Sequence, residues 1–133
     1  MDPVDLLAAA PCNGFFGFRL LRRSAERVEL ELPVRAAFAQ EAGVVQGGIL
    51  TALADTAAVY VLWPDLGPAR TMTGTGCAMQ FLAAADPAGP PLRATAVPLR
   101  IGRTIAVCES TVEQGTRLVA KGTFSFLLRD RRL

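Results

Sequence analysis

The 133 residues include 14 basic and 12 acidic side chains, for a formal net charge of +2. So small a charge gives no reason to expect nucleic acid or a membrane surface as a partner. The chain has no histidine, which excludes Ser-His-Asp and Cys-His nucleophile systems and His-containing zinc sites, and it has no Cys-x-x-Cys pair. Any catalysis must therefore use carboxylates, hydroxyls, amides or the backbone.

Length and composition predict a single cytoplasmic domain over residues 1–133. Its three cysteines, Cys12, Cys77 and Cys108, are widely spaced among apolar neighbours, which indicates reduced core residues and no disulfide framework. We expect no export signal, because acidic residues stand where such a signal is basic. We also expect no membrane span, because no apolar run approaches the ~20 residues that cross a bilayer.

The first third of the chain predicts a short helix, two strands and a loop. The helix, residues 2–10, has Asp2 as its cap and Pro3 in its first turn, and Pro11 and Gly14 end it. The segments that follow are strands over residues 15–22 and 27–32 and a loop over residues 33–43. Alternation of apolar and charged residues in the second strand is typical of a half-buried strand.

A long helix is predicted from about Gln46 to Trp63, and a proline ends it. It is apolar on nearly every side, which indicates a helix inside the protein. Two features do not fit a plain buried helix. Gly47 and Gly48 stand where a capping side chain is expected, and the lone carboxylate of Asp55 lies in the middle.

The second half of the chain predicts only strands. They are separated by breakers such as the turn at residues 86–91, and the joints at 102–103 and 114–115 are short enough for antiparallel hairpins. The predicted strands are residues 70–83, 92–101, 104–113 and 117–128. One helix against one curved antiparallel sheet is an α+β arrangement that leaves surface for a partner subunit.

The start of the long helix, Gln46-Gly47-Gly48 followed by Leu53-Ala54-Asp55, resembles the hotdog-fold acyl-CoA thioesterases. The likeness is to the phenylacetate-degradation (PaaI-like) group, in which His-Gly-Gly…Leu-Ala-Asp opens the central helix. Segments 100–107 and 118–123 are similar too, and the resemblance extends over almost the whole chain. It implies a hotdog fold, in which a curved antiparallel sheet wraps one long central helix, and hydrolysis of acyl-CoA esters by a homodimer or homotetramer.

The resemblance also implies roles for particular residues. Gly47 corresponds to the glycine whose amide polarises the thioester carbonyl, and Asp55 to the acidic nucleophile or general base. Gln40 corresponds to an amide near the carbonyl or the water, and Thr73 to a hydroxyl that helps hold the water. Gln46 replaces the family's histidine and can form hydrogen bonds but cannot do acid–base work. No metal or other cofactor is implied.

Physical chemistry supports the roles of Gly47 and Asp55, and each residue also has a structural alternative. Amides of the first helical turn lack intrahelical acceptors, and glycine lets a carbonyl oxygen approach them; the alternative is that Gly47 and Gly48 only allow tight packing. Asp55 has no basic residue within helical reach, so its pKa should be raised. The structural alternative is a carboxylate paired with the hydroxyl of Thr51 or Thr56.

The spacing of the two catalytic candidates predicts a dimer. Gly47 and Asp55 are eight residues apart, or ~12 Å along a helix, so one thioester carbon cannot touch both in one chain. Two antiparallel copies of the helix would place Gly47 beside the partner's Asp55. We therefore expect a two-fold dimer with two shared sites.

Substrate-binding candidates are helix and interface side chains, although most aromatic residues of such a chain form its core. They are Gln46, Gly48, Phe38, Tyr60, Trp63, Phe81 and Arg103, the last facing a CoA phosphate. The alternative function is a non-hydrolytic acyl-CoA or acyl-carrier binding module, suggested by Gln46. A hydratase of this fold would need a histidine. The sequence names neither the acyl group nor the choice between dimer and tetramer.

Overall fold

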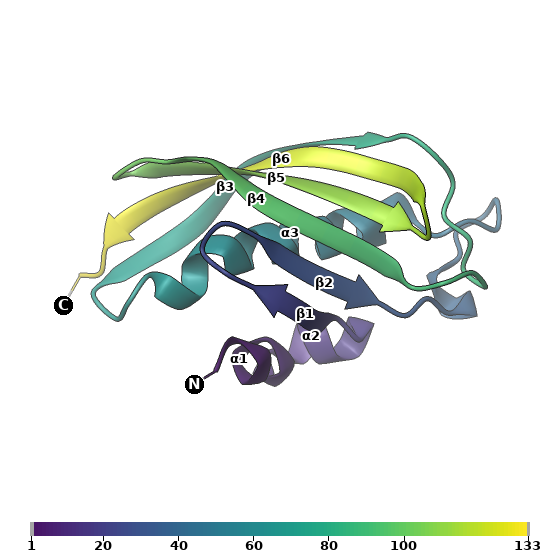
Figure 1. Ribbon diagram of the computed structural model, residues 1–133, viewed down its shortest axis with the longest axis horizontal. Helices are drawn as coiled ribbons and strands as arrows, with labels where there is room; N and C mark the ends of the chain where they lie inside the picture. Colours follow the sequence, from purple (N-terminus) through teal and green to yellow (C-terminus); the bar gives the residue numbers. More distant parts are fainter. Residues whose placement is uncertain (1, 133) are drawn as a thin grey trace.

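A computed structural model describes residues 2–132 as one curved antiparallel sheet that arches over a long helix (Figure 1). The six strands lie in the order β1-β2-β4-β5-β6-β3. The elements are α1 (Pro3–Ala9), α2 (Pro11–Phe16), β1 (Arg19–Arg23), β2 (Val28–Leu32), η1 (Ala36–Phe38), α3 (Gly47–Leu62), η2 (Trp63–Asp65), β3 (Arg70–Phe81), β4 (Leu92–Ile101), β5 (Ile105–Gln114) and β6 (Arg117–Asp130). This is the hotdog architecture that the sequence predicted.

The N-terminal region differs from the prediction, because residues 11–16 form the second helix α2 in place of a breaker and the start of a strand. Pro11 occupies the first turn of α2, where its missing N–H costs nothing. Gly17 ends the helix in the left-handed conformation, with φ of 90°. Strand β1 therefore begins only at Arg19, and α1 and α2 lie beside it (Figure 1).

The core lies between α3 and the concave face of the sheet. Alternate residues of β2 are buried, among them Val28, Leu30 and Leu32, and the same alternation runs through β4, β5 and β6. Ser110 on β5 donates a hydrogen bond of 2.8 Å from its hydroxyl to the carbonyl oxygen of Ala54. This buried bond joins the middle of α3 to β5.

Only one face of α3 is buried, so the prediction of a helix buried all round is wrong. Leu50, Leu53, Ala54, Ala57 and Ala58 face the sheet. The other face, which we call the open stripe, is exposed or half-buried and repeats every three or four residues. It consists of Gly48, Thr51, Ala52, Asp55, Thr56 and Val59. The carboxylate expected in the interior is thus exposed in the single chain.

The helical segment Gly47–Asp65, 19 residues with a mean hydropathy of 1.2, is long and apolar enough to cross a membrane by length and composition alone. The expectation that no run approaches that length is therefore wrong. The core helix of a folded domain meets the same criterion, and here 44% of the segment is buried against the rest of the chain. Packing on the sheet accounts for its apolar character.

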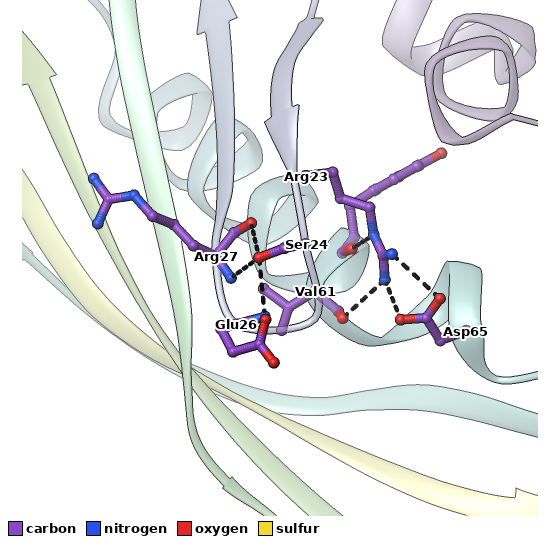
Figure 2. Close-up of polar contacts among 7 residues, drawn as sticks. Arg23, Ser24, Glu26, Arg27, Val61 and Asp65 are labelled. Carbon is purple, nitrogen blue, oxygen red and sulfur yellow. Dashed lines mark hydrogen bonds and ion pairs between the residues drawn. The ribbon is translucent and has the colours of Figure 1, made fainter.

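Arg23, the last residue of β1, closes the C-terminal end of α3 (Figure 2). Its Nε donates to the carbonyl oxygen of Tyr60 at 2.9 Å and its Nη2 to that of Val61 at 3.2 Å. Both carbonyls belong to the last turn, where no intrahelical donor is left and the helix dipole favours a cation. Asp65 holds the guanidinium from the other side, with an N–O distance of 2.7 Å.

Two smaller expectations also need correction. Only Cys108 is a core residue, while Cys12 and Cys77 are exposed, and all three are free thiols. The cluster of Arg129, Arg131 and Arg132 predicts a solvated C-terminal tail, but Arg129 is part of β6, which continues to Asp130 alongside the start of β3. The two predicted hairpins, β4–β5 and β5–β6, are confirmed.

Candidate active site

The first turn of α3 presents backbone amides without a side-chain cap. Gln46 is the N-cap residue, with φ of −60° and ψ of 134°, and its side chain makes no capping bond. Among residues 2–132, the amides of Gly47 and Gly48 have no hydrogen-bond acceptor. A Cβ added to Gly47 would lie 3.2 Å from the Phe81 ring, and one added to Gly48 would lie 3.1 Å from the side-chain oxygen of Gln46. A side chain at either position would therefore require Phe81 or Gln46, both exposed, to shift by a few tenths of an ångström.

Asp55 lies in the middle of the open stripe, between two threonines whose hydroxyls donate to backbone carbonyls and not to its carboxylate. The Thr51 hydroxyl donates to the carbonyl oxygen of Gly47 at 3.1 Å, and the Thr56 hydroxyl donates to that of Ala52 at 2.8 Å. Within residues 2–132 the carboxylate has no hydrogen-bond or ion-pair partner. Desolvation by the surrounding helix and sheet raises its pKa above the ordinary value of 3.8.

Asp55 borders two cavities, each of about 380 Å³. The first, which we call the aromatic cavity, lies toward the C-terminal half of α3. Its walls are Ala10, Asn13, Asp55, Thr56, Val59, Tyr60, Trp63, Met72, Gly74 and Phe126. The second, the small-residue cavity, lies toward the helix start, between the open stripe and β3. Its walls are Gly48, Thr51, Ala52, Asp55, Gly74, Gly76, Cys77, Phe124, Ser125 and Phe126.

Gln40 lies at the helix start and not beside Asp55. With Gly47 and Phe81 it borders a third hollow, of about 460 Å³, whose other walls are mainly apolar. The side-chain oxygen of Gln40 accepts from the backbone amide of Ala42, so its position is set by its own turn. The structure thus brings Gln40 and Gly47 together and keeps both apart from the Asp55 of the same chain.

Three predicted residues lie away from these hollows. Phe38 is 3% exposed and packs against Phe16 in the core, so it does not line an acyl pocket in this structure. Thr73 lies on β3 between Met72 and Gly74, which face the aromatic cavity, so strand alternation turns it to the opposite face. Arg103 lies exposed in the β4–β5 connection, where its carbonyl oxygen accepts from Arg70.

All the other predicted binding residues except Gln46 line the hollows. Tyr60 and Trp63 form one wall of the aromatic cavity and pack edge to face, with ring centroids 5.9 Å apart. Phe81 is 55% exposed and stands over Gly47. Gly48 lines the small-residue cavity, and Gln46 is exposed beside it.

Sequence reasoning missed Asn13, Val59 and Met72 as residues of the aromatic cavity. Helical spacing could have found Val59, which follows Asp55 by one turn. Asn13 carried no signal, because its place depends on the unpredicted helix α2 and on the packing of α2 near α3.

The sequence matches the profile of the thioesterase superfamily over residues 42–121, which is more than half of the chain. This segment contains the whole of α3, β3, β4 and β5 and the start of β6. No curated protein is found to match.

Solved structures of similar fold cover nearly the whole chain. AziG from S. sahachiroi is 28% identical, with a TM-score of 0.84 over 93% of this chain and 98% of its own. A point mutant of the phenylacetic acid degradation protein PaaI from Thermus thermophilus is 27% identical, with a TM-score of 0.79 over 89% of this chain and 98% of its own.

A phenylacetic acid degradation-related protein from Ralstonia eutropha is 24% identical, with a TM-score of 0.84 over 94% of this chain and 98% of its own, and shows the shared fold. The superfamily match, the long helix with its uncapped glycines and the six-stranded sheet all agree. The chain belongs to the thioesterase superfamily, and it shares its hotdog fold with structures of phenylacetic acid degradation proteins.

Proposed function

We propose that the protein is an acyl-CoA thioesterase, which hydrolyses the thioester of an acyl- or aryl-CoA to the free acid and CoA. The observation that carries this proposal is the Asp55 carboxylate. It lies on the open stripe of α3, borders two cavities and has no partner among residues 2–132, and its pKa is raised. A structural carboxylate is normally hydrogen-bonded, whereas a desolvated and unpaired one in a cleft is typical of a catalytic base.

A two-fold dimer would complete the site. Gly47 and Asp55 border different hollows of the same chain, and the ~12 Å between them along the helix is too far for one thioester carbon. The open stripe consists mainly of small residues, which would let a second, antiparallel α3 approach closely. The Gly47 amide would then lie beside the partner's Asp55.

Strand β3 supports the same assembly. It is the last strand of the sheet order, so one of its edges has no neighbour among residues 2–132. Between Thr71 and Phe81 it carries no charged side chain and no proline, although natural edge strands usually carry such residues to prevent pairing. Pairing of two β3 strands across the two-fold axis would make the two sheets continuous and bring the two open stripes together.

In this site the Asp55 carboxylate would take a proton from water as the water oxygen attacks the thioester carbon. Alternatively, it would attack that carbon itself and form a mixed anhydride, which water then hydrolyses to release the acid and restore the carboxylate. The Gly47 amide would donate to the carbonyl oxygen as negative charge develops there. The carbon–sulfur bond then breaks and the electron pair leaves with the thiolate of CoA. A thiol such as that of cysteine has a pKa of about 8.5, so a thiolate leaves without a strong general acid, and this step does not require a histidine at the position of Gln46.

Other residues would bind and orient the substrate. Gln40 and Phe81 border the hollow beside Gly47 and would contact the thioester or its pantetheine arm. Arg103 is exposed at the β4–β5 connection and would meet a CoA phosphate. The free thiols of Cys12 and Cys77 are consistent with work in the reducing cytoplasm, where acyl-CoA is made.

The first test is Asp55→Asn, assayed by thiol release from a panel of alkyl- and aryl-CoA esters. We expect kcat to fall by about a hundredfold or more, because a general base typically contributes 10²–10⁴ to the rate. Asp130→Asn is the matched control, since that carboxylate is exposed and, among residues 2–132, pairs with Arg70, and it should keep the wild-type rate. Full turnover by Asp55→Asn would remove the residue from the mechanism. Intact acyl-CoA recovered from the wild-type protein would instead identify a binding module.

A further inference from the structure

The Tyr60 side chain offers a hydrogen-bond donor inside the aromatic cavity. Tyr60 is only 3% exposed, and its side chain forms a hydrogen bond with Asn13. This bond lowers the pKa of Tyr60, the effect of a donor to the phenol oxygen, so the phenol proton itself is left to donate. Both side chains line the aromatic cavity. A buried phenol usually finds an acceptor in the protein, and this one leaves the position open to a ligand.

Asn13 holds this corner of the cavity in place. It is 8% exposed, and its Nδ2 donates to the carbonyl oxygen of Leu7 at 2.9 Å, which ties α2 to α1. Burial raises the pKa of Tyr60, and interaction with the Asn13 side chain offsets only part of that rise. The phenol therefore keeps its proton at neutral pH and can donate it.

The position of Tyr60 relative to Asp55 determines which part of a bound acyl group the Tyr60 hydroxyl can contact. The two residues are five positions apart on α3, or ~7.5 Å along the helix axis, and both border the same cavity. Val59 and Met72 are apolar residues of the same wall. An acyl group whose thioester carbon lies at Asp55 would extend past this wall and end at the Tyr60 hydroxyl.

We propose that Tyr60, positioned by Asn13, is a specificity-determining residue that selects acyl groups with a hydrogen-bond acceptor at their far end. The acceptor is a carbonyl or ether oxygen, several bonds from the thioester carbon. The assignment rests on the proposed function in one respect, namely that Asp55 marks the reacting carbon. A purely apolar acyl group of the same shape would leave the phenol proton without an acceptor, which a binding site penalises.

An isosteric pair of esters tests this selection, namely 4-methoxybenzoyl-CoA and 4-ethylbenzoyl-CoA, which differ by one ether oxygen in place of a methylene. For the wild type we expect kcat/KM to favour the methoxy ester by about three- to tenfold, the net effect of one hydrogen bond between neutral groups. In Tyr60→Phe, which keeps the ring and its packing against Trp63, the ratio should fall to about one.

Thr56→Val is the control from the same cavity, because the Thr56 hydroxyl is already bound to the Ala52 carbonyl, and it should keep the wild-type ratio. An equal preference in wild type and Tyr60→Phe, or a loss of preference in Thr56→Val as large as in Tyr60→Phe, would overturn the assignment. If neither ester is hydrolysed, calorimetric titration with the same two esters separates the question of hydrolysis from the question of selection by Tyr60. A methoxy preference in binding that disappears in Tyr60→Phe supports the donor although hydrolysis fails.

Discussion

At the scale of single residues, Asp55 is exposed in the single chain and still has a raised pKa. Desolvation acts on a carboxylate that is only partly covered, since the sheet and the helix shield one side of it. In the proposed dimer a second copy of the open stripe would exclude more water from the carboxylate, which raises its pKa. The partner's uncapped helix start would act in the opposite direction.

This shift predicts the pH dependence of both activity and stability. As a base, Asp55 must be ionised, so kcat/KM should fall on the acid side around a pKa above 3.8. Its folded-state pKa exceeds its unfolded-state pKa, so its contribution to stability is fully present below 3.8 and is lost as pH rises through the folded-state value. Asp55→Asn should therefore melt higher than the wild type at about pH 7, and the difference should shrink at about pH 4.

Melting curves of the two proteins at both pH values check the sign, with Asp130→Asn as the control for removal of an exposed carboxylate. A difference in melting temperature that grows as the pH falls would contradict a raised pKa. It would mean that the carboxylate is stabilised in the folded protein by a partner.

At the scale of elements, strand periodicity and breakers predicted most of the sheet. Alternation in residues 27–32 and the joints at 102–103 and 114–115 placed β2 and the two C-terminal hairpins within two residues of their observed bounds. Residues 11–16 were mispredicted, because Pro11 and Gly14 were interpreted as breakers. A proline that ends one helix can also begin the next, and only the packing of Phe16 and Phe18 beneath Phe38 distinguishes the two.

Only part of the candidate site could be predicted, because some of its residues gain their roles from tertiary packing. Gly47 and Asp55 were recognisable because each breaks a local rule for a buried helix. Asn13 and Arg23 obey local rules and gain their roles only from distant contacts, with Leu7 and Tyr60 respectively. Helix burial was overestimated, because an apolar pattern does not distinguish a face that packs on the sheet from one that is left for another subunit.

The Arg23 cap gives a prediction at this scale. Arg23→Met removes the donors to the Tyr60 and Val61 carbonyls and leaves the end of α3 without its cation. We expect the free energy of unfolding to fall by about 1.5–3 kcal/mol, the usual value of hydrogen bonds from a charged group. Arg22→Met is the control. Its side chain is 76% exposed and lies 3.7 Å from Glu29, so it should change stability by about 0.5 kcal/mol or less. Equal losses in urea titrations of the two variants would contradict the capping role.

At the scale of the whole molecule, a shared site makes a dimer testable through complementation. The chain offers a well-matched variant for the amide, because Gly47 is the first residue of α3 and proline is favoured there. Gln46 already has the extended backbone, with ψ of 134°, that a following proline requires. Gly47→Pro therefore removes the N–H while leaving the helix intact. Gly47→Ala adds the same Cβ beside Phe81 and keeps the N–H, which separates loss of the donor from crowding of the ring.

Gly47→Pro and Asp55→Asn should each be nearly inactive as homodimers, while Gly47→Ala should retain more activity than Gly47→Pro. If each site combines Gly47 of one protomer with the partner's Asp55, a heterodimer of Gly47→Pro and Asp55→Asn has one site with both defects and one with neither. Random exchange of equal amounts makes half of the dimers mixed, so unfolding and refolding the two variants together should restore about a quarter of wild-type activity. Refolding each variant alone controls for the procedure. If the mixture stays as inactive as its components while light scattering shows a dimer, each site must lie within a single chain, and the antiparallel pairing of the two α3 helices would be wrong.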